Sequence, residues 1–133
     1  SQLMLGDAMD VSVKSDVQAT YRYLVYRDGK KIIESEKTLE ARLVREIEAR
    51  GGMALKYTSQ YHRGIPDRIC LLPGGLSVFV ELKSTGKKPT KLQQHAMEQL
   101  DRMGHPNTVI DCTEKLEELL RILDEGMAKF AKN

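Results

Sequence analysis

The stretch 64–83, GIPDRICLLPGGLSVFVELK, decides how the rest of the chain is arranged. It contains two short apolar runs that flank the turn-forming tripeptide Pro-Gly-Gly at 73–75, a pattern that predicts a β-hairpin. The two strands of a hairpin run antiparallel, so the start of the first lies beside the end of the second. We therefore expect Asp67, which precedes the first strand, to lie close to Glu81 and Lys83 at the end of the second.

The residue types at this end of the hairpin suggest a particular chemistry. Side chains alternate across a strand, so Glu81 and Lys83 share a face while Leu82 points away. Two neighbouring carboxylates repel each other when both are ionised, and a divalent cation relieves that repulsion. A nearby lysine can offset charge that builds on a phosphate. Asp67, Glu81 and Lys83 thus suffice for metal-assisted phosphodiester hydrolysis, and the alternative is an ordinary ion pair at the mouth of the hairpin.

With these residues in place, the sequence resembles the VRR-NUC domain, a branch of the PD-(D/E)xK nuclease superfamily, of the stand-alone phage or bacterial type. The resemblance covers about residues 36–120, and the combination of motifs in this order is more specific than any one motif. The matching positions are Glu40, Lys56, Arg63-Gly64-Ile65-Pro66-Asp67, Pro73-Gly74-Gly75, Glu81-Leu82-Lys83 and Thr90-x-x-Gln93. The resemblance implies a restriction-endonuclease-like α/β core with a mixed central sheet. It also implies a divalent-metal-dependent DNA endonuclease that cuts Holliday junctions or other branched DNA.

The resemblance also implies roles for individual residues. Mg²⁺ or Mn²⁺ would be held by Asp67, Glu81 and the Leu82 backbone carbonyl, with Glu40 as a further candidate. Lys83 would assist the attacking water, and Glu40 and Gln93 would support catalysis. From its spacing alone, Glu40 is an ordinary surface glutamate, and Glu36 on the same helix is expected to be solvated. Gln93 also fits a capping box with Thr90, so a purely structural role for it stays open.

Basic residues gather around the motif, although the net charge of +2 is too small to imply nucleic acid by itself. A solvated charged face is the alternative. The candidates for binding DNA are Arg63, Lys56, Lys87, Lys88 and Lys91. A nucleic-acid-binding module that keeps the nuclease fold without cutting is the second functional hypothesis, and a structural protein or another enzyme is the third. The acidic pair argues against the second, because binding phosphate requires positive charge.

Helical periodicity and turn residues complete the predicted domain over 36–133. We expect a helix at 36–50 that Ser35 caps, a strand at 54–58, a helix from Thr90 to about 103, a strand at 107–111 and a final helix that Thr113 caps. The apolar stripe of the second helix comprises Leu92, Ala96, Leu100 and Met103. These helices should lie against the sheet, with the strand at 107–111 parallel to a neighbour.

Residues 1–35 are expected to form an N-terminal extension with its own β-hairpin. The dipeptide Asp28-Gly29 separates the β-prone runs 21–26 and 30–33, which is a strong hairpin signal. An isolated hairpin is marginal in water, so its aromatic face, with Tyr21 and Tyr23, needs a partner surface. We expect a homodimer, because a two-fold pair suits two symmetric cuts in a junction. A monomer whose hairpin folds back on its own sheet is the alternative.

The overall composition agrees with a single globular domain. The chain has 133 residues, of which 41% are hydrophobic and 30% charged. No apolar run approaches the ~18 residues of a membrane helix, and no secretory leader is evident, so no membrane partner is expected. Cys70 and Cys112 fall in apolar segments and are expected to be buried free thiols, which favours a cytoplasmic, reducing environment.

Overall fold

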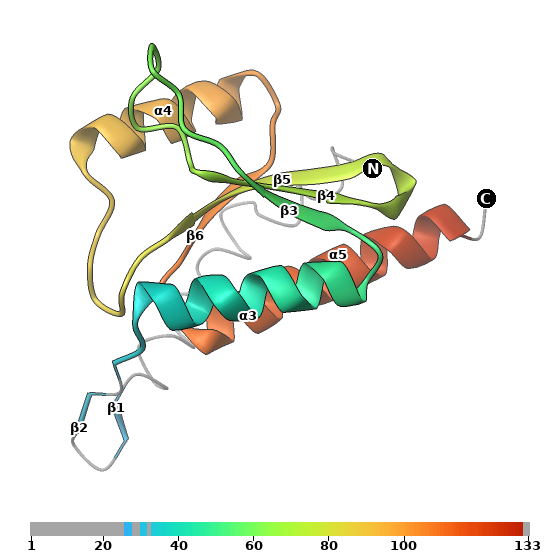
Figure 1. Cartoon of the computed structure of the whole chain (residues 1–133), viewed down its shortest axis with the longest axis horizontal. Coiled ribbons are helices and arrows are strands. Elements are labelled where there is room, and N and C mark those ends of the chain that lie inside the picture. The colour runs from blue at the N-terminus through green and yellow to red at the C-terminus, as the bar shows by residue number, and fades with distance from the viewer. Residues whose placement is uncertain (1–25, 28–29, 32, 132–133) are drawn as a thin grey trace.

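The computed structural model describes residues 26–27, 30–31 and 33–131, and its helices and strands follow the predicted order (Figure 1). They are β1 (Tyr26–Arg27), β2 (Lys30–Lys31), α3 (Glu36–Ala49), β3 (Met53–Lys56), β4 (Arg68–Leu72), a 3₁₀ turn (Pro73–Gly75), β5 (Leu76–Leu82), α4 (Lys91–Arg102), β6 (Asn107–Ile110) and α5 (Thr113–Ala131). Thr113 is the first residue of the last helix and not its cap. From α3 onward, the other predicted bounds lie within two residues of those in the structure.

The central sheet is mixed, as predicted. Its strand order is β3-β4-β5-β6, and the first three strands are antiparallel while β5 and β6 are parallel. The predicted hairpin joins β4 to β5 through Gly74 and Gly75, whose φ angles of 86° and 76° favour glycine. The register pairs Leu82 with Ile110, so the strand that carries the acidic motif lies inside the sheet.

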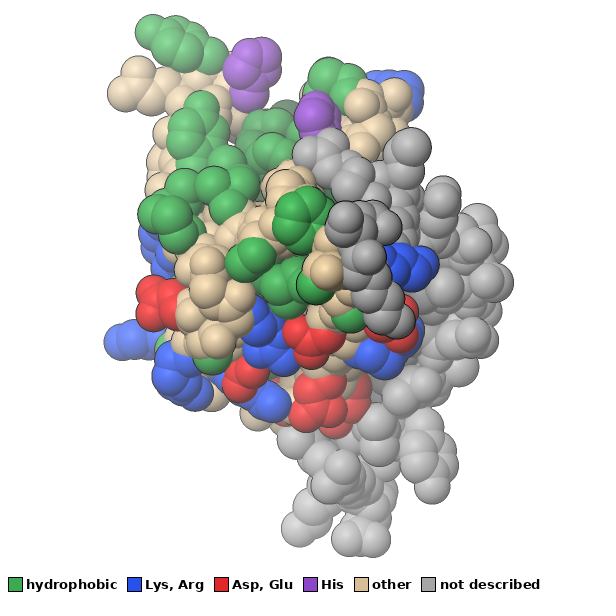
Figure 2. Space-filling model, turned by 90° about the vertical axis from the view of Figure 1, so that its right-hand side faces the viewer, with side chains coloured by type: hydrophobic (Ala, Val, Ile, Leu, Met, Phe, Trp, Pro, Cys, Tyr) green, Lys and Arg blue, Asp and Glu red, His purple; other side chains and the backbone are tan. Residues whose placement is uncertain are grey.

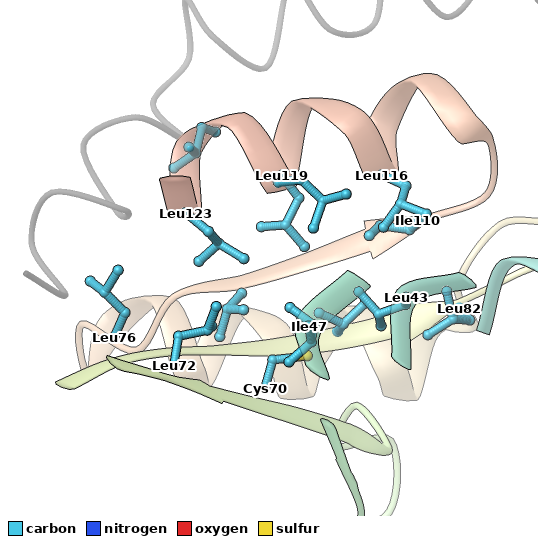
Figure 3. Close-up of a cluster of buried hydrophobic side chains, with 14 of the residues drawn as sticks. Leu43, Ile47, Cys70, Leu72, Leu76, Leu82, Ile110, Leu116, Leu119 and Leu123 are labelled. Atoms are coloured by element: carbon cyan, nitrogen blue, oxygen red, sulfur yellow. The ribbon is translucent and has the colours of Figure 1, made fainter. Parts of the chain in front are cut away.

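Three helices cover the sheet in two layers. Figure 1 shows α3 and α5 together on one face and α4 on the other. The predicted stripe of α3, namely Leu39, Leu43 and Ile47, is buried in the core that α3 and α5 form with the sheet. Figure 3 shows how side chains from β4, β5, β6 and α5 close this core. The fold is therefore α/β with helices flanking a mixed sheet.

The ends of α3 are defined as its sequence predicts. Ser35 is the N-cap, and its hydroxyl accepts a hydrogen bond from the Thr38 amide at 3.1 Å. The helix ends at Ala49, and Gly51 follows with a φ of 80°, which an L-residue with a side chain rarely adopts. Both ends are thus set by local chemistry.

The apolar stripe of α4 is only partly buried. Ala96 and Leu100 are buried, whereas Leu92 and Met103 expose 50% and 64% of their surface. The predicted apolar stripe is therefore buried in its middle and exposed at both ends. The main contact of α4 with the sheet is with β6.

The described part of the N-terminal extension pairs as predicted. β1 and β2 are antiparallel, with Tyr26 opposite Lys31 and Arg27 opposite Lys30. The proposed aromatic face with Tyr21 and Tyr23 lies outside the described residues.

Cys70 and Cys112 are buried free thiols, as expected, and burial raises the pKa of each to about 12. Thiols with so high a pKa remain protonated at neutral pH and are poor nucleophiles. Separately, none of the helices in the described ranges is both long and apolar enough to cross a membrane.

Candidate active site

A pocket of about 500 Å³ lies at the end of the sheet where β5 stops and where α3 and α4 begin. It brings together Asp67, Glu81, Lys83 and Gln93, four of the five residues that the sequence nominates for catalysis. The remaining lining residues are Glu36, Tyr57, Thr58, Ser59, His62, Arg63, Gly64 and Ile65. Tyr57, Thr58, Ser59 and His62 come from the loop after β3, and no sequence motif singles them out as site residues.

The Gly-Ile-Pro-Asp motif holds Asp67 against the start of α4. Gly64 has a φ of 89°, and a Cβ atom there would come within 2.6 Å of the Leu92 carbonyl oxygen. Only glycine fits such an approach between two backbones. Pro66 is fully buried, and the Asp67 carbonyl accepts a hydrogen bond of 2.7 Å from the Tyr57 amide. Asp67 therefore stands directly before β4, with its carbonyl hydrogen-bonded to the residue that follows β3.

The Glu-Leu-Lys motif alternates across β5 as predicted. Leu82 is 1% exposed and belongs to the core, whereas Glu81 and Lys83 line the pocket on the opposite face. The Lys83 amide donates a hydrogen bond of 2.9 Å to the Ile110 carbonyl, which continues the pairing with β6. The strand thus delivers one acid and one base to the same side.

Glu81 is an unusually placed acid. It is only 6% exposed, and burial is the main reason that its pKa rises to about 7. The Asp67 carboxylate raises this pKa further, as does Glu36 to a smaller extent, and Lys83 opposes the rise. Between residues 33 and 131, no ion pair within 4.0 Å joins Lys83 to either acid. The geometry therefore differs from the simple ion pair that was the alternative for this motif.

Gln93 forms the predicted capping box and also contacts the buried acid. Its side-chain oxygen accepts a hydrogen bond of 2.9 Å from the Thr90 amide, while the Thr90 hydroxyl accepts one from the Gln93 amide. These two bonds form the predicted capping box of α4. In addition, the Gln93 amide Nε2 donates to Glu81 Oε1 at 3.1 Å. One residue therefore starts the helix and orients the buried acid.

Glu40 is not among the residues that line the pocket. Its Oε2 lies 3.3 Å from Arg68 Nε and 4.0 Å from Lys56 Nζ, so it is engaged in ion pairs on the flank of α3. Lys56 is accordingly directed toward this helix and is also absent from the pocket lining.

Glu36, one turn earlier on the same helix face, lines the pocket instead. Its side chain is exposed, as expected from the sequence, and faces this pocket. The Glu36 amide donates to the Ser84 hydroxyl at 3.2 Å, next to Lys83. Glu34 and Thr85 are joined by three hydrogen bonds, of 2.8, 3.0 and 3.3 Å, that tie the start of α3 to the same loop. The sequence could have indicated Glu36 as a site residue, because it precedes Glu40 by four residues and both acids therefore lie on one face of the helix.

The basic candidates divide into two groups. Arg63 lines the pocket, whereas Lys87, Lys88 and Lys91 are exposed on the loop that leads from β5 into α4 and on its first turn. They lie outside the pocket lining, so any role for them concerns DNA beyond the reacting phosphate.

Two carboxylates at this pocket fit a hard divalent cation better than a soft one. Across the described ranges, no three His, Cys, Asp or Glu side chains are grouped so as to hold a metal ion by themselves. Mg²⁺ commonly takes one or two carboxylates and completes its shell with water and substrate phosphate. Asp67 and the buried Glu81 match that pattern, because a cation would favour the charged form of Glu81, whose pKa is raised first by burial and then by the Asp67 carboxylate.

Comparison with known proteins agrees with this geometry. No family model matches the chain. A protein named "Putative nuclease p44", from Acyrthosiphon pisum secondary endosymbiont phage 1, is 42% identical over 76 residues, which cover 57% of this chain and 82% of the phage protein. A solved structure described as a VRR_NUC domain superimposes with a TM-score of 0.62 at 24% identity, covering 66% of this chain and 97% of that one.

The mixed sheet and its flanking helices define an α/β domain with the restriction-endonuclease-like fold of the VRR-NUC domain. The chain belongs to the same family as the phage putative nuclease.

Proposed function

We propose that the protein is a divalent-metal-dependent DNA endonuclease that hydrolyses phosphodiester bonds in branched DNA such as Holliday junctions. The observation that carries the proposal is the convergence of Asp67, buried Glu81 and Lys83 in one pocket. Two acids beside a reacting phosphate are unfavourable unless a cation is present, so this arrangement supports cutting better than binding alone.

Asp67, Glu81 and the Leu82 carbonyl are the residues that would hold Mg²⁺ or Mn²⁺. When bound, such an ion lowers the pKa of a water molecule and offsets charge on the phosphate. Glu36, which lines the same pocket, is a candidate for binding a water molecule in the shell of the ion, the supporting role first assigned to Glu40.

The other side chains of the pocket have separate tasks. The Lys83 ammonium group orients the attacking water or stabilises charge on the phosphate. Gln93 keeps one oxygen of Glu81 oriented through its hydrogen bond of 3.1 Å. Arg63 lines the same pocket and offers its guanidinium group to a neighbouring phosphate.

The preference for branched DNA and the homodimer remain linked proposals. One pocket makes one cut, whereas a four-way junction needs two cuts related by symmetry, and a two-fold dimer supplies both. Exposed Lys87, Lys88 and Lys91 would grip the arms through phosphates, and affinity should then fall steeply with salt. Sedimentation of the protein at micromolar concentration tests the dimer, and a monomer would remove this part of the proposal.

A cleavage panel tests the activity itself. Four-way junctions, flaps, single strands and linear duplex are incubated with Mg²⁺, Mn²⁺ or EDTA, with Asp67→Ala as the inactive control. We expect cleavage of branched substrates in either metal and none in EDTA. Full activity in EDTA would contradict the metal mechanism, and binding without cleavage under all conditions would support the non-cleaving module.

A further inference from the structure

A second hollow, of about 600 Å³, adjoins the candidate active site. Four residues line both: Tyr57, Ser59, His62 and Ile65. Beyond them, the second hollow is bounded by Phe79, Gln99, Leu100, Arg102 and Met103. We call it the base groove. Because it shares a wall with the catalytic pocket, a molecule that reacts in the pocket would extend directly into it.

The base groove differs chemically from the pocket beside it. Beyond the shared residues, its apolar lining comes from the middle of β5 and the end of α4, where Leu100 is buried and Phe79 is half-buried. Its polar groups, Gln99 and Arg102, are exposed. Acids line the first pocket, whereas Asp, Glu and Lys are absent from the described residues that line the second.

Two aromatic side chains, Tyr57 and Phe79, line this groove. Tyr57 is 49% exposed, and Phe79 holds its ring edge-on to His105 with the centroids 6.3 Å apart. Met103 adds an exposed thioether at the end of α4. Figure 2 shows hydrophobic side chains exposed together on one side of the molecule. Such apolar exposure beside a charged site is typical of a ligand-binding groove.

We propose that the base groove takes one unpaired nucleobase of the DNA strand whose phosphate lies in the candidate active site. Every nucleobase has a flat π face that stacks on aromatic side chains, whatever the sequence. Arg102 at the edge is suited to a flanking phosphate, and Gln99 to a polar edge of the base. A base inside a duplex is stacked and paired, so only a strand that is single or opened at a branch can enter.

The inference rests on the proposed function and deepens it. It assigns the preference for branched DNA to a feature within one protomer, since a branch point supplies unpaired nucleotides beside the cut. The groove therefore predicts a requirement at one nucleotide position, independent of which of the four bases stands there.

The test is an abasic scan. Single abasic sites are placed, one per substrate, at each of the three nucleotides on either side of the branch point of a flap. Both kcat/KM in Mg²⁺ and binding in Ca²⁺, by fluorescence anisotropy, are measured. We expect a loss of about 5- to 100-fold at one position, the scale of one base stacked on an aromatic ring.

Variants connect that loss to the groove. Phe79→Leu keeps an apolar side chain but removes the ring, and Met103→Asp changes an exposed position, so it serves if the first variant folds poorly. In either variant the intact flap should be cleaved more slowly than by the wild-type protein. Placing the abasic site in the substrate should then lower kcat/KM only a little further. Met53→Asp is the matched control, because Met53 is also exposed, at 56% against 64%, and lines neither hollow.

The possible outcomes separate the two proposals. Normal cleavage with a flat abasic scan, or an abasic loss that persists unchanged in both groove variants, overturns the base groove alone. A position-specific loss in binding without any cleavage supports the groove and overturns the nuclease mechanism. If the scan shows no loss of binding at any position and no substrate is cleaved, both proposals are wrong.

Discussion

The two faces of the sheet are built from the same strands but do different work. On one face, Cys70, Val78, Val80 and Leu82 meet α3 and α5 and are fully buried. On the other, the intervening residues of β4 and β5 are covered only in part by α4, and this face carries Glu81. Apolar burial, which stabilises the fold, is concentrated on the closed face. The open face has room for a buried acid and two adjoining hollows, so stability and function should respond to different substitutions.

The largest difference in stability should be between two leucines on opposite sides of the sheet, Leu43 of α3 and Leu71 of β4. Leu43 is 0% exposed in the core, whereas Leu71 on the open side is 41% exposed. We expect Leu43→Ala to lower the free energy of unfolding by about 2–5 kcal/mol, and Leu71→Ala by less than about 1 kcal/mol. Urea titration measures both. An equal cost for Leu71→Ala would mean that something covers the open face in solution, such as a second copy of the chain.

Lys83 should affect the rate and not the fold. Lys83→Ala is expected to reduce cleavage at least ~10²-fold, the scale of losing one charge-stabilising group, while metal binding by calorimetry stays near normal. Lys129→Ala, in the last turn of α5, loses the same charge away from the pocket and serves as the control. An equal loss in both variants would mean that only the total positive charge matters.

The two acids of α3 should behave differently, although they share a helix face. Glu36→Gln is expected to weaken metal binding or cleavage about 10- to 100-fold, as for residues that support metal ligands. Glu40→Gln should leave cleavage nearly unchanged and cost up to about 1 kcal/mol of stability through its ion pair with Arg68. Metal titration and thermal melting of both variants separate these roles. The reverse pattern would restore Glu40 to the site.

Glu81 predicts a pH dependence of stability in the metal-free protein. Its pKa in the fold is about 7 against an ordinary 4.5, so the fold favours the protonated form. The contribution of Glu81 to the free energy of unfolding is therefore fully present below about pH 4.5 and is lost as the pH rises to about 7. In EDTA, Glu81→Gln should melt at least ~2 °C above wild type at pH 8, with the difference gone below pH 4.5. A variant that melts lower at pH 8 would contradict this reasoning.

The smallest effects should separate the two bonds of Gln93. Gln93→Ala removes the capping box and the bond to Glu81, so stability should fall by up to about 1 kcal/mol and cleavage should also decline. Gln93→Glu retains a capping oxygen but replaces the donor to Glu81 with a carboxylate. It should preserve the helix start at pH 5 and impair cleavage. If Gln93→Glu cleaves normally, the contact with Glu81 has no catalytic importance.

Local patterns in the sequence were sufficient for the order of elements and for the core of the site. Alternation along 76–82 determined that Glu81 and Lys83 point away from Leu82, because side chains on a strand alternate whatever packs against them. The antiparallel hairpin brought Asp67 to the same end, because its turn at 73–75 left only one register for two short strands.

Only the tertiary structure decided which helix acid reaches the pocket, how Gln93 is shared between two partners, and where the open face is hollowed. Each depends on contacts between residues far apart in the chain, such as the Glu36 amide with Ser84 and Gln93 with Glu81. Helical periodicity assigns residues to a face but not to a position along the partner surface. Periodicity alone does not separate Glu36 from Glu40, which lie four residues apart on one face. The contacts of the start of α3 with the loop at 84–85 bring Glu36 to the pocket.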